Sequence, residues 1–143
     1  MRIRVVSLLV TGLAMIGASA ATPVDEAAAR KSATEFAATL PSTGFKLREG
    51  HWCGPLTQAK SRLIQLHLYA GNEYRFAVGA TTSARSLGVS LFDEGGLPVV
   101  VPAVSEGNTV ALSFAPEASG PYYFRLEQLE GGPTTFCLIY SYK

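Results

Sequence analysis

The sequence carries little charge and has no block of like charges. Its 12 lysine and arginine residues nearly balance its 11 aspartate and glutamate residues, and charged residues make up 16% of the chain. A near-neutral, mixed surface offers no strong electrostatic attraction for nucleic acid or for an anionic membrane surface. We therefore expect neither of these as a partner.

Long hydrophobic runs and catalytic motifs are also missing. After residue 20, no apolar stretch reaches the ~20 residues that a membrane-spanning helix needs. The sequence has no G-x-S-x-G, Walker, G-x-G-x-x-G or H-E-x-x-H motif, and neither C-x-x-C nor H-x-x-x-H spacing occurs. We predict no membrane anchor in the processed chain, no metal or cofactor, no catalytic residues and no enzymatic activity.

The first twenty residues have the pattern of a secretory signal peptide. Arg2 and Arg4 precede an uncharged, mostly apolar run over residues 5–17, and Ala18-Ser19-Ala20 supplies the small residues that a signal peptidase reads. We predict that residues 1–20 are cleaved, and that the protein is exported to the periplasm or the extracellular space.

The two cysteines of the chain are Cys53 and Cys137. Two cysteines in a small exported domain usually pair, so a disulfide between them is predicted, with two free thiols as the alternative. His51, beside Trp52 and Cys53, could instead form a Cys–His nucleophile pair. Neighbouring side chains point apart in an extended chain, which favours the structural bridge.

A helix is predicted over residues 24–40, within an N-terminal segment that spans residues 21–44. Pro23 suits the first helical turn, Asp25 and Glu26 complement the positive end of the helix dipole, and six alanines favour helix. The apolar stripe that includes Phe36 and Leu40 is narrow for a core helix. Packing on the domain and acting as a spacer are therefore both open.

Residues 45–143 follow a period of two, which is typical of strands. Alternating apolar residues predict seven short strands, at residues 64–69, 73–78, 87–92, 97–101, 109–114, 122–127 and 134–142. Since no helical pattern lies between them, the predicted fold class is all-β, an antiparallel jelly-roll-like β-sandwich preceded by one helix. Each strand is expected to bury one face and expose the other. The expected core comprises Leu66, Tyr74, Phe76, Val89, Leu91, Leu112, Phe114, Tyr122 and Phe124.

Three stretches resemble the bacterial pre-peptidase C-terminal domain and related small secreted sandwiches. Residues 68–76 are similar to its "L-x-A-G-x-x-Y-x-F" pattern, residues 91–96 to its "L-x-D-x-x-G" turn, and residues 114–123 to its "F-x-x-P-x-x-G-x-Y-Y" strand start. Members of that family are usually accessory domains beside an extracellular enzyme. The resemblance implies a stand-alone sandwich whose task is open.

Exposed aromatic side chains are the candidate binding residues. Trp52, Tyr69 and Tyr123 lie in loops or on the polar side of their strands, and could stack on sugar rings or on a partner's aromatic groups. Alternatively, Phe36 and Leu40 of the N-terminal helix could pack against the same rings. His67 is expected to be an exposed histidine. Four acids, Glu73, Asp93, Glu94 and Glu106, could hold Ca²⁺ if their turns met, although a plain hairpin at residues 93–96 is the simpler interpretation.

Three functions follow from these features. The first is a non-catalytic exported module with a structural or interaction role in the bacterial envelope or outside the cell, with a protein or a glycan as its unidentified partner. The second is a carbohydrate-binding module that uses the exposed aromatics. A small secreted hydrolase is the third, and it would need a cleft that places His51 or His67 beside a carboxylate.

Overall fold

The computed structural model describes residues 20–143, and residues 1–19 of the predicted signal peptide lie outside them. One helix, α1 (Pro23–Thr39), precedes the strands. The strands in the described residues are β1 (Lys46–Leu47), β2 (Trp52–Leu56), β3 (Arg62–Leu68), β4 (Tyr74–Ala80), β5 (Ala84–Phe92), β6 (Pro98–Val99), β7 (Ala103–Glu106), β8 (Thr109–Phe114), β9 (Gly120–Gly131) and β10 (Thr134–Tyr142). No helix in this part of the chain is long and apolar enough to cross a membrane.

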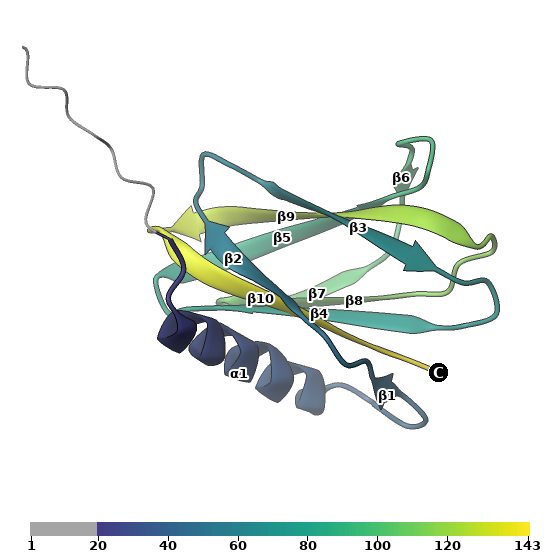
Figure 1. Ribbon diagram of the computed structural model, residues 1–143, viewed down its shortest axis with the longest axis horizontal. Helices are drawn as coiled ribbons and strands as arrows, with labels where there is room; N and C mark the ends of the chain where they lie inside the picture. Colours follow the sequence, from purple (N-terminus) through teal and green to yellow (C-terminus); the bar gives the residue numbers. More distant parts are fainter. Residues whose placement is uncertain (1–19) are drawn as a thin grey trace, which may run out of the picture.

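Two antiparallel sheets face each other, which confirms the predicted all-β sandwich (Figure 1). The first sheet has the order β1-β10-β4-β8-β7, and β2 also pairs with β10, farther along the same edge as β1. The second sheet has the order β3-β9-β5-β6. The short strands β2 and β3 are consecutive in the chain but belong to different sheets, so they border one open side of the sandwich.

Three strands were absent from the sequence prediction. β1 has only two residues, too few to show a period. β2 contains Gly54 and Pro55, which are typical of turns, and all four residues of β7 are exposed, so β7 shows no alternation. The final strand was predicted with the bounds that the structure shows.

The core between the sheets contains most of the residues that were expected there. Seven of the nine are buried: Leu66, Tyr74, Phe76, Leu91, Leu112, Tyr122 and Phe124. Val89 and Phe114 are only half-buried against this core. Val89 has a partner strand on one side only, because β6 pairs just with Leu91 and Phe92. Phe114 is the last residue of β8, where its ring meets the edge of the Tyr122 ring.

Helix α1 covers the outer face of the first sheet (Figure 1). The side chain of Thr22 caps its first turn by accepting a hydrogen bond from the Asp25 N–H. Phe36 packs against Ala77, Ala111 and Ile139, which project outward from β4, β8 and β10. The helix therefore docks on the sandwich and does not act as a spacer.

Each strand was expected to expose one of its two faces to solvent. This prediction is wrong for the strands under the helix. Ala77, Ala111 and Ile139 are at most 4% exposed. Two of these are alanines, and Gly79 lies close to them in β4. A Cβ atom at Gly79 would collide with the backbone of Ala33 and lie 2.6 Å from the carbonyl oxygen of Ala29. Small residues on the outer phase thus leave room for a closely packed helix.

Candidate binding cleft

A disulfide joins β2 to β10, as the sequence predicts. Cys53 lies directly opposite Cys137, with their Cα atoms 4.1 Å apart. Because both cysteines of the chain are in the bond, no thiol is available for a Cys–His nucleophile pair while it is intact. The bond fixes the edge strand β2, and with it the neighbouring residue Trp52.

Trp52 is held by a stack of aromatic rings. Its ring lies on that of Tyr140 in β10, with 5.7 Å between centroids and 27° between planes. The Tyr140 ring in turn contacts Phe76 at 5.6 Å and Tyr74 at 6.2 Å. Trp52 nevertheless remains 37% exposed. This geometry gives a rigid ring that is anchored on the core and still accessible to a ligand.

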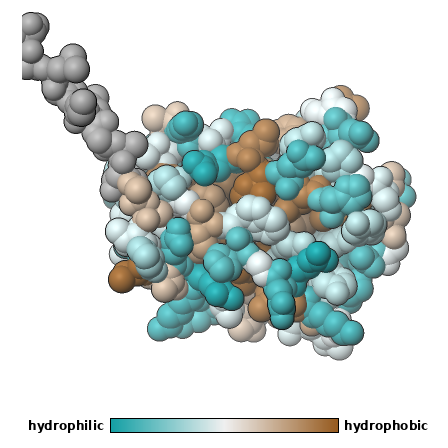
Figure 2. All heavy atoms as spheres, viewed as in Figure 1, coloured by the Kyte–Doolittle hydropathy of each residue, from teal (hydrophilic) through white to brown (hydrophobic). Residues whose placement is uncertain are grey.

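Beside Trp52, the open side of the sandwich forms a cleft of about 440 Å³ between β2 and β3, which we call the edge cleft. Most of its polar groups come from His51, Arg62 and Gln65, and its lining comprises His51, Trp52, Cys53, Arg62, Leu63, Ile64, Gln65 and Phe136. Figure 2 shows hydrophobic side chains gathered on this side of the molecule, over the region where β3 crosses in Figure 1, with hydrophilic ones around them. A mixed lining of this kind suits a ligand with both apolar faces and hydrogen-bonding groups.

Arg62 reaches across the cleft from β3 toward β2. Its side chain lies on the same, inward-facing side of β3 as those of Ile64 and Leu66. Its guanidinium carbon lies 5.9 Å from the centroid of the Phe136 ring, and one guanidinium nitrogen would be 3.2 Å from a Cβ atom built on Gly54. The glycine in β2 thus leaves space for the arginine side chain.

The phenol of Tyr140 has a shifted pKa. Burial raises the pKa of Tyr140 above its ordinary value, and the Arg48 guanidinium opposes this by favouring the phenolate. Arg48 therefore lies close enough to act on the ring that supports Trp52. Its backbone N–H also donates to the Tyr140 carbonyl oxygen at 2.9 Å.

The three aromatic residues singled out from the sequence do not share one surface. Trp52 lies in the edge cleft, whereas Tyr69 follows the end of β3 and Tyr123 lies on β9 of the second sheet. Tyr69 is 53% exposed and its ring is 4.9 Å from that of His67. Tyr123 is half-buried on the outward phase of β9, between Gln65 and Phe92. Helix α1 contacts none of them within its packed cluster, so the aromatics do not serve as its docking site.

The acids considered for Ca²⁺ do not gather. Among residues 20–143, no group of three or more His, Cys, Asp or Glu side chains is placed to hold a metal ion. A carboxylate oxygen of Asp93 accepts a hydrogen bond from the Leu97 N–H at 2.9 Å, which closes the hairpin turn. Glu73 pairs with Lys143 at 3.2 Å.

The positions of Arg62 and Gln65 at the edge cleft were missed from the sequence, whereas Tyr140 was one of the aromatic residues that it offered for stacking. Arg62 did carry a signal, because a charged residue in phase with the buried Ile64, Leu66 and Leu68 must reach an opening or a partner. The cleft itself depends on how β2 and β3 lie relative to each other, which no local pattern shows. No protein-family model matches this chain, and no curated protein is significantly similar to it.

Proposed function

We propose that the protein is an exported, non-catalytic module with an interaction role, and that the edge cleft is its binding site. The observation that carries this proposal is Trp52, which is stacked on Tyr140 yet 37% exposed in an open cleft. An anchored ring loses little conformational entropy when a ligand binds, so it favours affinity. The predicted signal peptide and the disulfide support export.

A saccharide is the ligand class that the cleft suits best. Sugar rings combine apolar C–H faces with hydroxyl groups, and the indole of Trp52 offers a flat surface for the former. His51 and Arg62 supply hydrogen-bonding groups for the latter. The resemblance to the pre-peptidase C-terminal domain supports an accessory binding role, because members of that family usually stand beside extracellular enzymes.

The cleft lacks the arrangement that would favour a hydrolase. A hydrolase site would place a histidine beside a carboxylate. Among the described residues that line the cleft, His51 is present but no aspartate or glutamate is. This composition supports binding without chemistry.

Trp52 makes the proposal directly testable, because it is the only tryptophan in the chain. Tryptophan emission, separated from that of the tyrosines, therefore reports on the cleft. We expect members of a polysaccharide panel to change this fluorescence on titration, and Trp52→Ala to abolish retention on the same polysaccharides in affinity electrophoresis.

The matched control is Tyr69→Ala, which removes an exposed ring that does not line the cleft. It should leave binding unchanged, and thermal melting should show that both variants are folded. If Tyr69→Ala lost binding and Trp52→Ala kept it, the binding site would lie at Tyr69 and not in the edge cleft, and the proposal would be contradicted.

A further inference from the structure

We propose that the edge cleft selects carboxylated saccharides, with Arg62 binding the carboxylate of a uronic acid while its sugar ring lies against Trp52. This inference rests on the proposed function and names its ligand class. It follows from three features of the cleft. Arg62 has no acidic partner, the charges around it are mainly positive, and an aromatic ring lies in the same cleft.

Arg62 has no acidic partner in the described residues. The ion pairs there join Lys31 to Glu35, Arg85 to Glu130, Arg125 to Glu127 and Lys143 to Glu73. Arg62 is half-buried and makes no side-chain hydrogen bond within residues 20–143, and its guanidinium nitrogens remain accessible to solvent. A guanidinium carries five N–H donors, and a half-buried cation gains most when an anion uses several of them.

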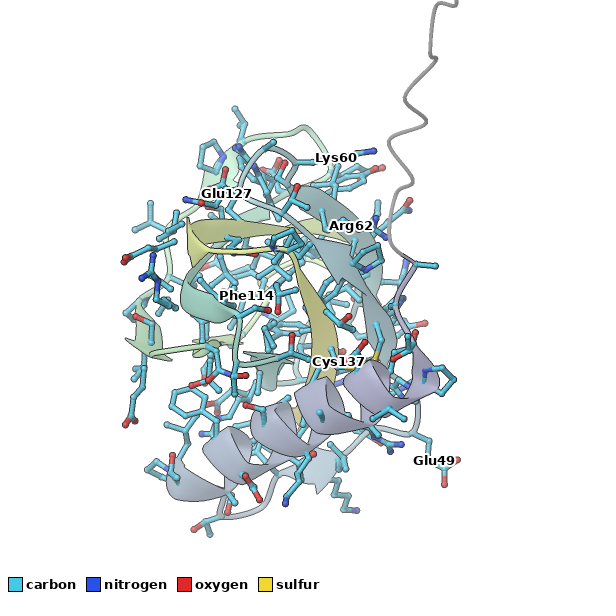
Figure 3. All side chains as sticks on the ribbon, turned by 90° about the vertical axis from the view of Figure 1, so that its left-hand side faces the viewer. Glu49, Lys60, Arg62, Phe114, Glu127 and Cys137 are labelled. Atoms are coloured by element: carbon cyan, nitrogen blue, oxygen red, sulfur yellow. A yellow bond between two sulfur atoms is a disulfide. The ribbon has the colours of Figure 1, made fainter. Side chains whose placement is uncertain are left out.

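The charges around the cleft are mainly positive. Arg62 lines it, Lys60 precedes β3, and Arg48 acts on the Tyr140 ring under Trp52. No carboxylate is among the described residues that line it. Figure 3 shows Lys60 and Arg62 in the upper part of the sandwich, where Glu127 also lies, and Glu49 projecting outward near helix α1. Glu127 is paired with Arg125. The local field therefore favours an anionic ligand although the whole chain is close to neutral.

The geometry favours a carboxylate on a sugar over a simple anion. The planar guanidinium fork matches the two oxygens of a carboxylate. The guanidinium lies over the Phe136 ring, and the absence of a side chain at Gly54 leaves room for it there. Trp52 on the same cleft then provides a flat ring for the remainder of a uronate residue.

Three uronate-containing polysaccharides test the inference: polygalacturonate, alginate and hyaluronate. Each is compared with the form in which its carboxyl groups are methyl-esterified. Esterification removes the charge and leaves the sugar rings in place. We expect the purified protein to bind at least one acidic polymer about tenfold or more tightly than its ester, measured by Trp52 fluorescence and calorimetry. The preference should shrink as NaCl is raised, because salt screens the ion pair.

Two arginine variants separate Arg62 from general charge. Arg62→Gln should reduce affinity for the acidic polymer to that for its ester, whereas Arg62→Lys should keep part of the preference, because it keeps the charge without the fork. Arg85→Gln is the matched control, since Arg85 is exposed, is paired with Glu130 and does not line the cleft. It should bind as the unmodified protein does. If Arg62→Gln fails to fold by thermal melting, the ester comparison on the unmodified protein decides alone.

Several results would overturn the inference. Equal binding of each acid and its ester, lost in Trp52→Ala, would reject the carboxylate and leave the proposed function standing. Dextran sulfate binding as tightly as the polyuronates, and surviving Trp52→Ala, would show unspecific charge attraction. No binding of any of the six polymers would reject uronate recognition, and the wider polysaccharide panel would then decide the proposed function separately.

Discussion

At the scale of single residues, Tyr140 connects the core to the candidate site. Its ring lies between Trp52 in the cleft and Phe76, which is fully buried. Burial and the neighbouring phenols of Tyr74 and Tyr142 disfavour its ionisation, while Arg48 favours it. The net effect is a raised pKa, so the folded protein favours the neutral phenol more strongly than the unfolded chain does.

This raised pKa predicts a loss of stability in alkali. Below the ordinary value of 10.0, Tyr140 is neutral in both states and its contribution is constant. As the pH rises above that value, the unfolded chain ionises first and unfolding becomes more favourable. We expect the free energy of unfolding, measured in urea from pH 8 to pH 11, to fall less steeply for Tyr140→Phe than for the unmodified protein. Tyr69→Phe, at an exposed position, should keep the original slope, and parallel slopes for all three proteins would contradict the assignment.

At the scale of elements, the close contact between α1 and β4 depends on the absence of a side chain at Gly79. The helix backbone passes directly over Gly79, so that a Cβ atom there would lie 2.6 Å from the Ala29 oxygen and 2.8 Å from the carbonyl carbon of Ser32. Neither contact can be relieved by a side-chain rotation, because both atoms belong to the helix backbone. The helix must therefore shift if residue 79 is anything larger than glycine.

Gly79→Ala is accordingly expected to loosen the helix. Overpacking of this kind typically costs about 1–3 kcal/mol. The variant should show a lower melting temperature, and Arg30 and Lys31 in α1 should be cut faster by trypsin under native conditions. Gly132→Ala is a suitable control, since a Cβ atom there meets nothing within 4 Å. Unchanged cleavage in Gly79→Ala would mean that the helix does not rest on β4 in solution.

The same elements show what a single sequence can and cannot predict. The central strands were found because Leu66, Phe76 and Phe124 alternate with polar or small residues, and such alternation is a local property. The helix was found from its alanines and its first turn. Its docking was not, because a row of small residues on a strand indicates a covered face only once the helix is known to lie there. The cleft escaped prediction for a related reason, since Trp52 and Arg62 come together through packing of separate sheets.

At the scale of the whole molecule, the disulfide links the candidate site to global stability. It closes a loop of 84 residues that contains β3 to β9, and it attaches β2 to β10, the strand that also carries Tyr140. Cys137 is fully buried, with its sulfur 3.3 Å from the carbonyl oxygen of Glu26 in helix α1. Sandwich, helix and cleft thus meet at this bond.

Removing the bond should therefore act in two stages. For a loop of this length, chain entropy predicts a stability loss of roughly 4 to 5 kcal/mol, and measured losses are often smaller. We expect the double variant Cys53→Ser with Cys137→Ser to lose about 2 to 5 kcal/mol in urea denaturation. Before the core melts, β2 should loosen from β10, since the rest of its pairing is short. The fluorescence of Trp52 should then shift to longer wavelength at denaturant concentrations where circular dichroism still reports intact strands.

The unmodified protein with dithiothreitol should follow the double variant, and without reductant its two transitions should coincide. Peptide mapping of the native protein under non-reducing conditions should recover Cys53 and Cys137 in one linked pair. If both cysteines are alkylated freely before reduction, the bond is absent from the native protein and the attachment of β2 must come from its backbone pairing alone. If the bond is present but its removal leaves Trp52 unmoved until global unfolding, the Tyr140 stack is sufficient to hold the cleft, and the disulfide stabilises the sandwich without shaping the site.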